Sequence, residues 1–402
     1  MNAYRKFVNY CLLYANTSVS AGMAGIALSY CIFGASQSTL LLSLQLGLYT
    51  IPVLLMPLAG SLVDRYSTAR VLTASLLSRT VLLAVFALLA THDDPPIPLL
   101  LAISFLVGVI RQPHPGALRK VFSATIPDGE YVKANGYINV VGPVGGAVGA
   151  LLAGFLISQI GAPNTVLIAA AMFTTQVLTL PFVPNVQPAQ HSVKISFDWS
   201  GIRLIRRASI DTGLAVALAV MAIATAPFQI LLPGRMAEWG HGSGGYGIAM
   251  ASSTVGITVG GLFVAWAGRR LSLGQGVVPG VIAVGASVAF IPQVGGSLPI
   301  VAGLIVVSGI GGAIAESFIF ARFHATVAPD LQGRVFSALS GLESLAATIG
   351  FLAAGALAVV TGPNAVFWVA GAITVLAAWF TLRASLKAPA TEQQEAHATA
   401  AS

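Results

Sequence analysis

Residues 39–90 read TLLLSLQLGLYTIPVLLMPLAGSLVDRYSTARVLTASLLSRTVLLAVFALLA. Two largely apolar runs, 39–60 and 71–90, flank a short polar turn that carries Asp64 and Arg65. A helix needs about 20 apolar residues to cross the hydrocarbon core of a bilayer. The stretch therefore predicts two membrane-spanning helices joined by a charged turn at one membrane surface.

The rest of the chain repeats this pattern. Of its 402 residues, 56% are hydrophobic and 8% are charged, whereas about a quarter of the residues of a soluble domain are charged. The predicted fold is all-α: a polytopic membrane protein of twelve transmembrane helices with short loops and no large soluble domain. Apolar runs between polar breaks predict spans at 8–33, 39–60, 71–90, 98–115, 136–160, 164–183, 211–232, 246–267, 275–292, 298–321, 336–361 and 365–384.

Basic residues are distributed unevenly between the predicted loops. The chain has 20 Lys and Arg against 13 Asp and Glu, a net charge of +7. With loops on alternate sides, one side receives 17 of the basic residues and the other receives Arg235 alone, while Arg79 and Arg111 fall within spans. This bias predicts that both termini lie in the cytoplasm. We therefore expect the basic residues to face membrane lipids and expect no nucleic-acid partner.

The sequence offers no site for catalysis, a cofactor or a metal ion. It contains no Gly-Lys dipeptide, which excludes the phosphate-binding loop of many ATPases. Its six histidines are scattered without the spacing of metal ligands. Cys11 and Cys31 are about 30 Å apart on one predicted helix, too far for a disulfide. We expect a protein that is not an enzyme and that needs no cofactor.

Short motifs recur in the same order at a nearly constant offset, which predicts two parallel six-helix halves. We expect a first half at 1–183, a cytoplasmic linker at 184–210, a second half at 211–384 and a disordered tail at 385–402. Two interpretations fit the linker, a helix lying on the inner membrane surface and a plain tether. The recurring pairs are Pro127-Asp128 with Pro329-Asp330, Ala153-Gly154 with Ala354-Gly355, and Pro163-Asn164 with Pro363-Asn364.

The charged turn after residue 59 resembles a family motif. Gly60 permits a close helix approach, Asp64 can accept backbone N–H groups near a helix start, and Arg65 and Arg70 can face anionic headgroups. The run Gly60-Ser-Leu-Val-Asp64-Arg65 is similar to the Gly-x-Leu-x-Asp-Arg loop of the major facilitator superfamily, and it stands at the position that family requires. The resemblance implies that these residues latch the cytoplasmic ends of the two halves together in the outward-facing state.

A second motif lies in the fifth predicted span. The run Gly142-Pro143-Val144-Gly145-Gly146 resembles the Gly-Pro-x-x-Gly-Gly signature of the superfamily's drug:proton antiporters, with Ala147 in place of the last glycine. The resemblance implies export, and helix packing by small residues is the alternative. The loops at 126–135 and 328–337 are similar to those of the branch that holds enterobactin-type siderophore exporters and macrolide efflux pumps. A multi-pass transporter of the bacterial cytoplasmic membrane is implied.

Four charged side chains lie within predicted spans: Arg79, Arg111, Glu316 and Glu343. Each costs about 2.5 to 3.5 kcal/mol at the centre of a spanning helix on insertion scales. Because loss of water disfavours the ionised form of a carboxyl group, the two acids are candidate proton carriers. The alternatives are that Glu343 only partners a basic residue, that Arg79 forms a structural ion pair, and that Arg111 lies close enough to the inner face to reach it.

Asn16, Asn139 and Gln229 are polar residues that can line a cavity or hydrogen-bond between helices. By resemblance, a small-molecule substrate is expected near the midplane, between the first, fourth, seventh and tenth spans. The predicted function is proton-coupled efflux of a drug, macrolide, siderophore or similar amphiphile by a monomer that works by alternating access. The alternatives are a lipid or lysophospholipid flippase on the same fold, and a non-transporting membrane sensor or scaffold.

Overall fold

The computed structural model describes residues 3–126, 131–188, 212–327 and 329–386. Within these ranges the chain forms α-helices and 3-10 helices and no β-strand. Most of the predicted linker and of the predicted tail lies outside the described residues. The elements are α1 (Ala3–Ser36), α2 (Thr39–Thr50), η1 (Ile51–Leu55), α3 (Met56–Arg65), α4 (Thr68–Ala90), α5 (Ile97–Ile110), α6 (Pro113–Thr125), α7 (Tyr131–Ile160), α8 (Ala162–Thr179), η2 (Leu180–Phe182), α10 (Thr212–Ile230), α11 (Leu232–Glu238), α12 (Gly242–Ala267), η3 (Gly268–Arg270), α13 (Leu273–Phe290), η4 (Ile291–Val294), α14 (Leu298–Thr326), α15 (Pro329–Thr361) and α16 (Pro363–Leu386).

In the described ranges, ten helices are long and apolar enough to cross a membrane. The segment of α2, η1 and α3 passes the same test as a pair of helices bent by 58°, which makes up to eleven spans. A shorter apolar stretch, Pro363–Trp379, belongs to α16. Each predicted span overlaps helices of the structure, so the prediction of an all-helical, multi-pass membrane protein is confirmed. The predicted number of twelve spans stays a prediction, because ten to eleven segments of the described chain pass the test.

Glycines and prolines form the turns that end two long helices. α7 and α15 are each followed by a glycine with positive φ, +84° at Gly161 and +80° at Gly362. Residues with a Cβ atom rarely adopt this conformation. Pro163 and Pro363 then lie in the first turn of the next helix, where a missing N–H group costs nothing. These two turns contain the Pro-Asn pairs that recur in the sequence.

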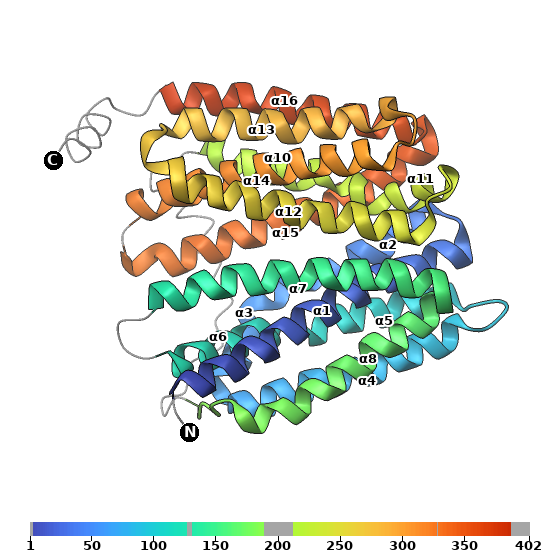
Figure 1. Ribbon diagram of the computed structural model, residues 1–402, viewed down its shortest axis with the longest axis vertical. Coiled ribbons are helices and arrows are strands. Elements are labelled where there is room, and N and C mark those ends of the chain that lie inside the picture. The colour runs from blue at the N-terminus through green and yellow to red at the C-terminus, as the bar shows by residue number, and fades with distance from the viewer. Residues whose placement is uncertain (1–2, 127–130, 189–211, 328, 387–402) are drawn as a thin grey trace.

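Figure 1 shows the helices as two bundles, with α1 to α8 in one and α10 to α16 in the other. Glycines let the helix backbones touch within each bundle. A Cβ atom added at Gly22 of α1 would lie 2.6 Å from the carbonyl oxygen of Gly146 on α7, and one at Gly309 of α14 would lie 2.6 Å from that of Ser253 on α12. Close packing of this kind holds helices together inside lipid. Lipid is as apolar as the helix surfaces, so no hydrophobic effect drives the helices to associate.

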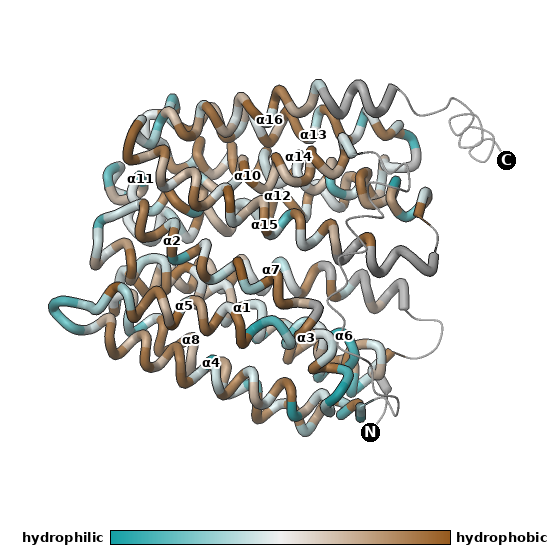
Figure 2. The backbone as a smooth tube through the Cα atoms, turned by 180° about the vertical axis from the view of Figure 1, so that it is seen from behind, coloured by the Kyte–Doolittle hydropathy of each residue, from teal (hydrophilic) through white to brown (hydrophobic). Residues whose placement is uncertain are grey.

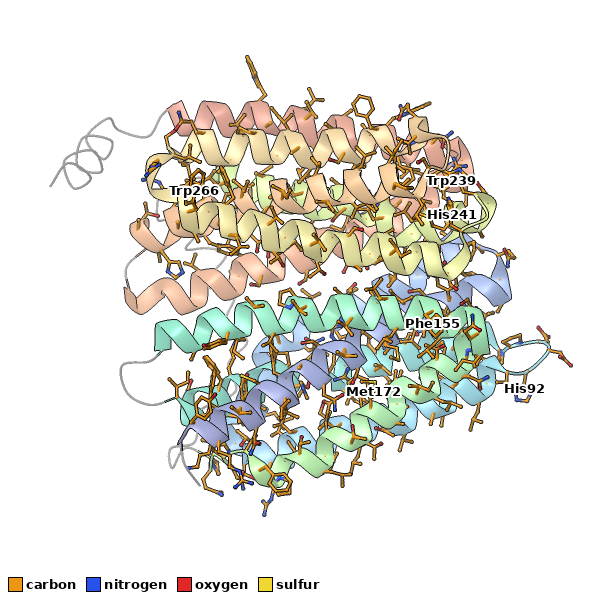
Figure 3. The ribbon with its side chains drawn as sticks, in the orientation of Figure 1. His92, Phe155, Met172, Trp239, His241 and Trp266 are labelled. Carbon is orange, nitrogen blue, oxygen red and sulfur yellow. The ribbon has the colours of Figure 1, made fainter. Side chains whose placement is uncertain are left out.

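The polar residues gather at the ends of the bundles. Figure 2 shows hydrophobic residues along the helices and hydrophilic ones mainly at their ends. The start of α1 and the turn between α3 and α4 lie at one end, and α11, which carries Arg235, lies at the other. Trp239 and Trp266 also lie at opposite ends in Figure 3, and Trp266 is 74% exposed. Tryptophan is typical of the membrane–water interface, and its position at both ends fits helices that cross the bilayer along their axes.

One predicted span ends too early. The apolar run predicts a span at 98–115, but α6 continues α5 to Thr125, and together they form one candidate span. Polar residues of α6, among them His114 and Arg119, interrupt the apolar run. Because α6 adds about 20 Å of helix at 1.5 Å per residue, Arg111 lies near the middle of this candidate span, Ile97–Thr125. Whether its side chain reaches the inner face stays a prediction.

Replacing Gly149 with valine is expected to lower the thermal unfolding midpoint of the purified protein by several degrees. A Cβ atom at Gly149 would collide with the carbonyl oxygen of Val19 on α1, and forcing extra volume into a packed interface costs about 1–3 kcal/mol. Gly303→Val is the matched control, because a Cβ atom there meets no atom within 4 Å. Equal midpoints for the two variants would show that α1 and α7 do not pack closely at this point.

Candidate functional site

The two bundles touch through α7 with α12 and through α2 with α15. Ser243 Oγ donates a 3.1 Å hydrogen bond to the Gly154 carbonyl oxygen, and the hydroxyl oxygens of Thr50 and Thr348 are 2.8 Å apart. Glycine permits this approach, since a Cβ atom at Gly154 would lie 3.1 Å from the Cα of Gly247. The contact between α7 and the start of α12 lies at the end of the molecule that carries α11.

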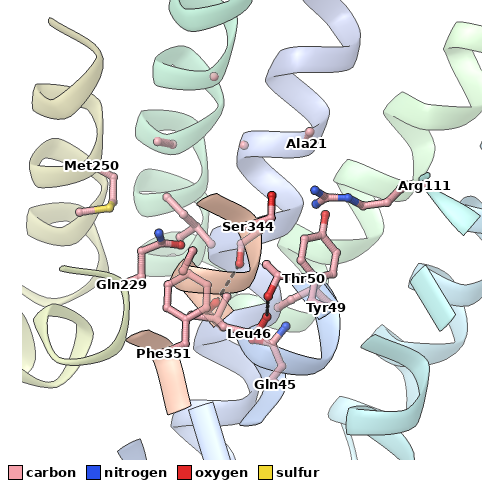
Figure 4. A pocket seen from close by; sticks show the side chains of 18 of the residues that line it. Ala21, Gln45, Leu46, Tyr49, Thr50, Arg111, Gln229, Met250, Ser344 and Phe351 are labelled. Carbon is pink, nitrogen blue, oxygen red and sulfur yellow. Dashed lines mark hydrogen bonds between the residues drawn. The ribbon is translucent and has the colours of Figure 1, made fainter. Parts of the chain in front are cut away.

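A cavity of 420 Å³ lies between the bundles, and a second one of 360 Å³ adjoins it on the side of the second bundle. Gln229 and Met250 line both cavities, so the two cavities share part of their walls. Figure 4 shows the larger cavity, with Arg111 and Tyr49 on one side and Gln229, Met250 and Phe351 on the other. A space of this size can hold a small organic molecule.

Arg111 reaches the larger cavity at a break in its span. α5 ends one residue before Arg111, and Pro113, which has no N–H group, begins α6. The side-chain amide of Gln112 donates a 2.7 Å hydrogen bond to the carbonyl oxygen of Gly108, a group that lipid could not satisfy. The Arg111 guanidinium lies 4.5 Å from the centroid of the Tyr49 ring and points towards its hydroxyl group in Figure 4.

A second arginine lies behind Arg111. Arg79 on α4 is 4% exposed, and its guanidinium carbon lies 3.9 Å from the centroid of the Phe173 ring, a cation–π contact. Arg79 Nε has no hydrogen-bond partner, and neither does either ring nitrogen of the buried His114. In the described part of the chain neither arginine forms an ion pair. The alternative that Arg79 forms a structural ion pair thus finds no partner among the described residues.

Glu316 on α14 and Glu343 on α15 line the smaller cavity. The Glu316 side chain is exposed and that of Glu343 is half-buried. The two carboxylates are close enough to interact electrostatically, so ionising both at once is unfavourable. Neither forms an ion pair with another described residue. The alternative that Glu343 only partners a basic residue therefore has no support in this part of the chain.

The three predicted polar residues differ in position. Gln229 lines both cavities. Asn16 Nδ2 donates a 3.1 Å hydrogen bond to Thr175 Oγ1. This bond joins α1 to α8, so Asn16 has the second of its two expected roles, a hydrogen bond between helices. The side chain of Asn139 lies outside the described residues. Gln229 is thus the member of this set that the structure brings to the cavity.

The charged turn connects α3 to α4, and two details of its predicted role are wrong. Asp64 lies at the end of α3 rather than at a helix start, and its Oδ1 is 2.7 Å from Lys120 Nζ on α6. A Cβ atom at Gly60 would meet no atom within 4 Å, so Gly60 makes no close helix contact. α3 instead packs on α6 where Val63 lies 3.5 Å from the Cβ position of Gly116. The local pattern predicts a turn but not which helix covers it.

The start of α4 also binds the chain that leaves the first bundle. Val186 N donates a 2.9 Å hydrogen bond to Thr68 Oγ1, and Thr68 N donates a 3.0 Å bond to the Val186 carbonyl oxygen. Arg65 and Arg70 are exposed beside this contact. The ion pair of Asp64 stays within the first bundle, so the latch between the halves stays a prediction.

The glycine-rich run of α7 contributes to both packing and the cavity. A Cβ atom at Gly142 would lie 2.9 Å from the Tyr14 hydroxyl oxygen. Pro143 lies inside the helix, and Gly146 lines the larger cavity. The packing alternative for this motif therefore holds, and the same run forms part of the cavity wall.

Sequence reasoning missed Tyr49 and His114. Tyr49 lines the larger cavity one helical turn after Gln45, which lines it too. Residues four apart lie on the same face of a helix, so a polar and an aromatic residue at this spacing in an apolar span is the signal that points to Tyr49. His114 has no comparable signal, because its position depends on the unpredicted continuation of the span into α6.

Cysteines placed at Thr50 and Thr348 are expected to form a disulfide when the protein is oxidised in membranes. The two hydroxyl oxygens are 2.8 Å apart, within reach of the geometry of a disulfide. Cys11 and Cys31 are first replaced by serine, and loss of maleimide labelling measures the cross-link. Each single cysteine variant is the control and should stay reactive. Full labelling of the double variant after oxidation would contradict the contact between α2 and α15.

Comparison with known proteins identifies the family. The family model described as Major Facilitator Superfamily matches residues 8–234 and 212–402. No curated protein matches the chain. A solved structure of a mutant of the nucleoside transporter NupG is 14% identical with a TM-score of 0.79, covering 96% of this chain and 100% of that one.

Two further solved structures are similar. A POT family transporter in complex with 5-aminolevulinic acid is 12% identical with a TM-score of 0.76, covering 95% of this chain and 96% of that one. A bacterial homolog to the human lysosomal transporter Spinster, in an inward-facing and unoccupied conformation, is 15% identical with a TM-score of 0.72, covering 95% and 97%. At these identities the likeness shows the fold alone. The chain belongs to the major facilitator superfamily of membrane transporters.

Proposed function

We propose that the protein exports a small amphiphilic compound across the bacterial cytoplasmic membrane in exchange for protons. The compound binds in the two adjoining cavities, and Glu316 and Glu343 carry the protons. The fold does not identify the compound, because proteins that share one fold bind unrelated substrates. A drug, a macrolide and a siderophore are the classes that the sequence motifs favour.

The proposal rests on the position of the two acidic side chains. Glu316 and Glu343 line a cavity inside the membrane, and neither forms an ion pair with a described residue. A carboxylate within a membrane-spanning helix that only stabilised the fold would need a cationic partner. An unpaired acid at a cavity can bind a proton or a positively charged group, and the two compete for the same oxygen atoms. Because of this competition, the substrate and the protons cross the membrane in opposite directions.

Contacts between the bundles support alternating access. The hydrogen bond from Ser243 to Gly154 and the Thr50 to Thr348 contact join the halves through glycine and small hydroxyl residues. If the positively charged end is cytoplasmic, the Ser243 contact closes the outer end. The Asp64 to Lys120 ion pair within the first bundle is consistent with a latch between the halves that is open in this conformation.

Everted membrane vesicles test the proton exchange. Respiration acidifies their interior, and an exported compound added outside should release protons and restore the fluorescence of a quenched pH-sensitive dye. Ethidium, erythromycin and enterobactin are the compounds to be added. Glu316→Gln and Glu343→Gln are expected to slow the recovery at least about tenfold, because an amide cannot carry the proton. Glu238→Gln is the matched control, since Glu238 is 59% exposed and pairs with Arg235 at the other end of the molecule.

Two results would contradict the proposal. Uptake of a compound into wild-type vesicles without any release of protons would rule out exchange and would favour the flippase alternative. Wild-type recovery in both Glu316→Gln and Glu343→Gln would show that another group carries the protons.

A further inference from the structure

We propose that the transported compound is zwitterionic, with its acidic group bound at Arg111 and its basic group bound at Glu316 and Glu343. This inference rests on the proposed function, because it takes the two adjoining cavities as the substrate site. It adds the charge of the substrate, which the proposed function leaves open.

The charges near the middle of the helices are divided between the halves. The first half has Arg79 and Arg111 there, and its acids among the described residues lie in turns or at helix ends. The second half has Glu316 and Glu343 there; Arg322 lies about 9 Å further along α14 from Glu316 at 1.5 Å per residue. The first-half acids outside mid-helix positions are Asp64, Asp93 and Asp94.

The side of the larger cavity formed by Arg111, Tyr49 and Gln45, here termed the cationic wall, has no anion of its own. Arg111 and Arg79 lie close enough to repel each other, and neither forms an ion pair in the described part of the chain. Gln45 is 1% exposed and lines the same cavity; its amide oxygen, which has no hydrogen-bond partner, can accept only from a donor and does not itself bind an anion. A carboxylate, phosphate or sulfate bound here would neutralise the charge of Arg111.

Apolar side chains line both cavities as well. Met250 lines both, Phe351 lines the larger one and Phe228 the smaller one. A molecule with an apolar body and one charged group at each end matches a site that has the cationic wall in one cavity and the two acids in the other. Hydrogen bonds to charged groups contribute about 1.5–3 kcal/mol each, so both ends add affinity.

A singly charged compound fits the site less well. A cation would leave the cationic wall without a counter-ion. An anion would bind best when Glu316 and Glu343 hold protons, so the anion and the protons would bind together rather than compete, and linkage would drive them in the same direction. A compound with both charges satisfies the arginine while its basic group still displaces a proton from the acids.

Three linear compounds test this proposal on the purified full-length protein in a non-ionic detergent. 8-Aminooctanoic acid carries an amine at one end and a carboxylate at the other; octylamine has a methyl group in place of the carboxylate, and octanoic acid has a hydrogen atom in place of the amine. Isothermal titration calorimetry gives the Kd of each compound. The wild-type protein is expected to bind 8-aminooctanoic acid about tenfold more tightly than either singly charged probe.

Two variants should separate the two ends of the probe. Arg111→Gln is expected to weaken both carboxylate-bearing probes about tenfold and to leave octylamine unchanged. The double variant Glu316→Gln/Glu343→Gln should weaken both amine-bearing probes by a similar factor and leave octanoic acid unchanged. Arg119→Gln is the matched control, because Arg119 is exposed on α6 and lines neither cavity. Arg111→Lys keeps the charge and should retain most of the carboxylate binding.

An equal loss of all three probes in Arg111→Gln, with Arg111→Lys equally impaired, would overturn the proposal, because it would show that Arg111 only shapes the cavity. Wild-type protein that binds 8-aminooctanoic acid no more tightly than the singly charged probes would overturn it as well. Binding is measured without a proton gradient. A failure here therefore leaves the proton exchange of the vesicle experiment intact, and a failure of proton exchange leaves the selectivity for two charges intact.

Discussion

The bilayer interior contains no water, and this constraint explains most of the structure. Every backbone polar group must be satisfied within the protein, so the described chain is helical, and the amide of Gln112 binds the Gly108 carbonyl oxygen where Pro113 interrupts a span. Glycines such as Gly22 let helices touch because packing rather than hydrophobicity joins helices in lipid. The same constraint keeps charged side chains away from the lipid.

The cavity follows from where those charges can lie. Arg111 faces the space between the bundles, Arg79 stacks on Phe173 behind it, and Glu316 and Glu343 face the adjoining space of the second bundle. Opposite charges on separate bundles avoid a permanent ion pair, which would be stable and would hold the halves in one arrangement. They remain available to a molecule between the halves. In the proposed exchange, the same side chains would link substrate binding to the movement of the two bundles.

The sequence predicts much of the fold and less of the site, and both outcomes have physical causes. Apolar runs and turn residues such as Pro163 and Pro363 act locally, so they predict the helices and their order. The continuation of α5 into α6, the Asp64 to Lys120 ion pair and the stacking of Arg111 on Tyr49 depend on contacts between distant segments, which no local pattern contains. The intramembrane charges stood out because their insertion is costly, but their partners could not be predicted.

In the proposed exchange, a basic group of the substrate and protons compete for Glu316 and Glu343. This competition is measured as the release of protons when octylamine binds to the purified protein in weakly buffered solution, followed with a pH indicator. Binding is expected to release protons from the wild-type protein and from Arg111→Gln, and to release none from Glu316→Gln/Glu343→Gln. Binding of octylamine to the wild-type protein without any release of protons, across the pH range in which the protein is stable, would show that the amine and the protons do not compete.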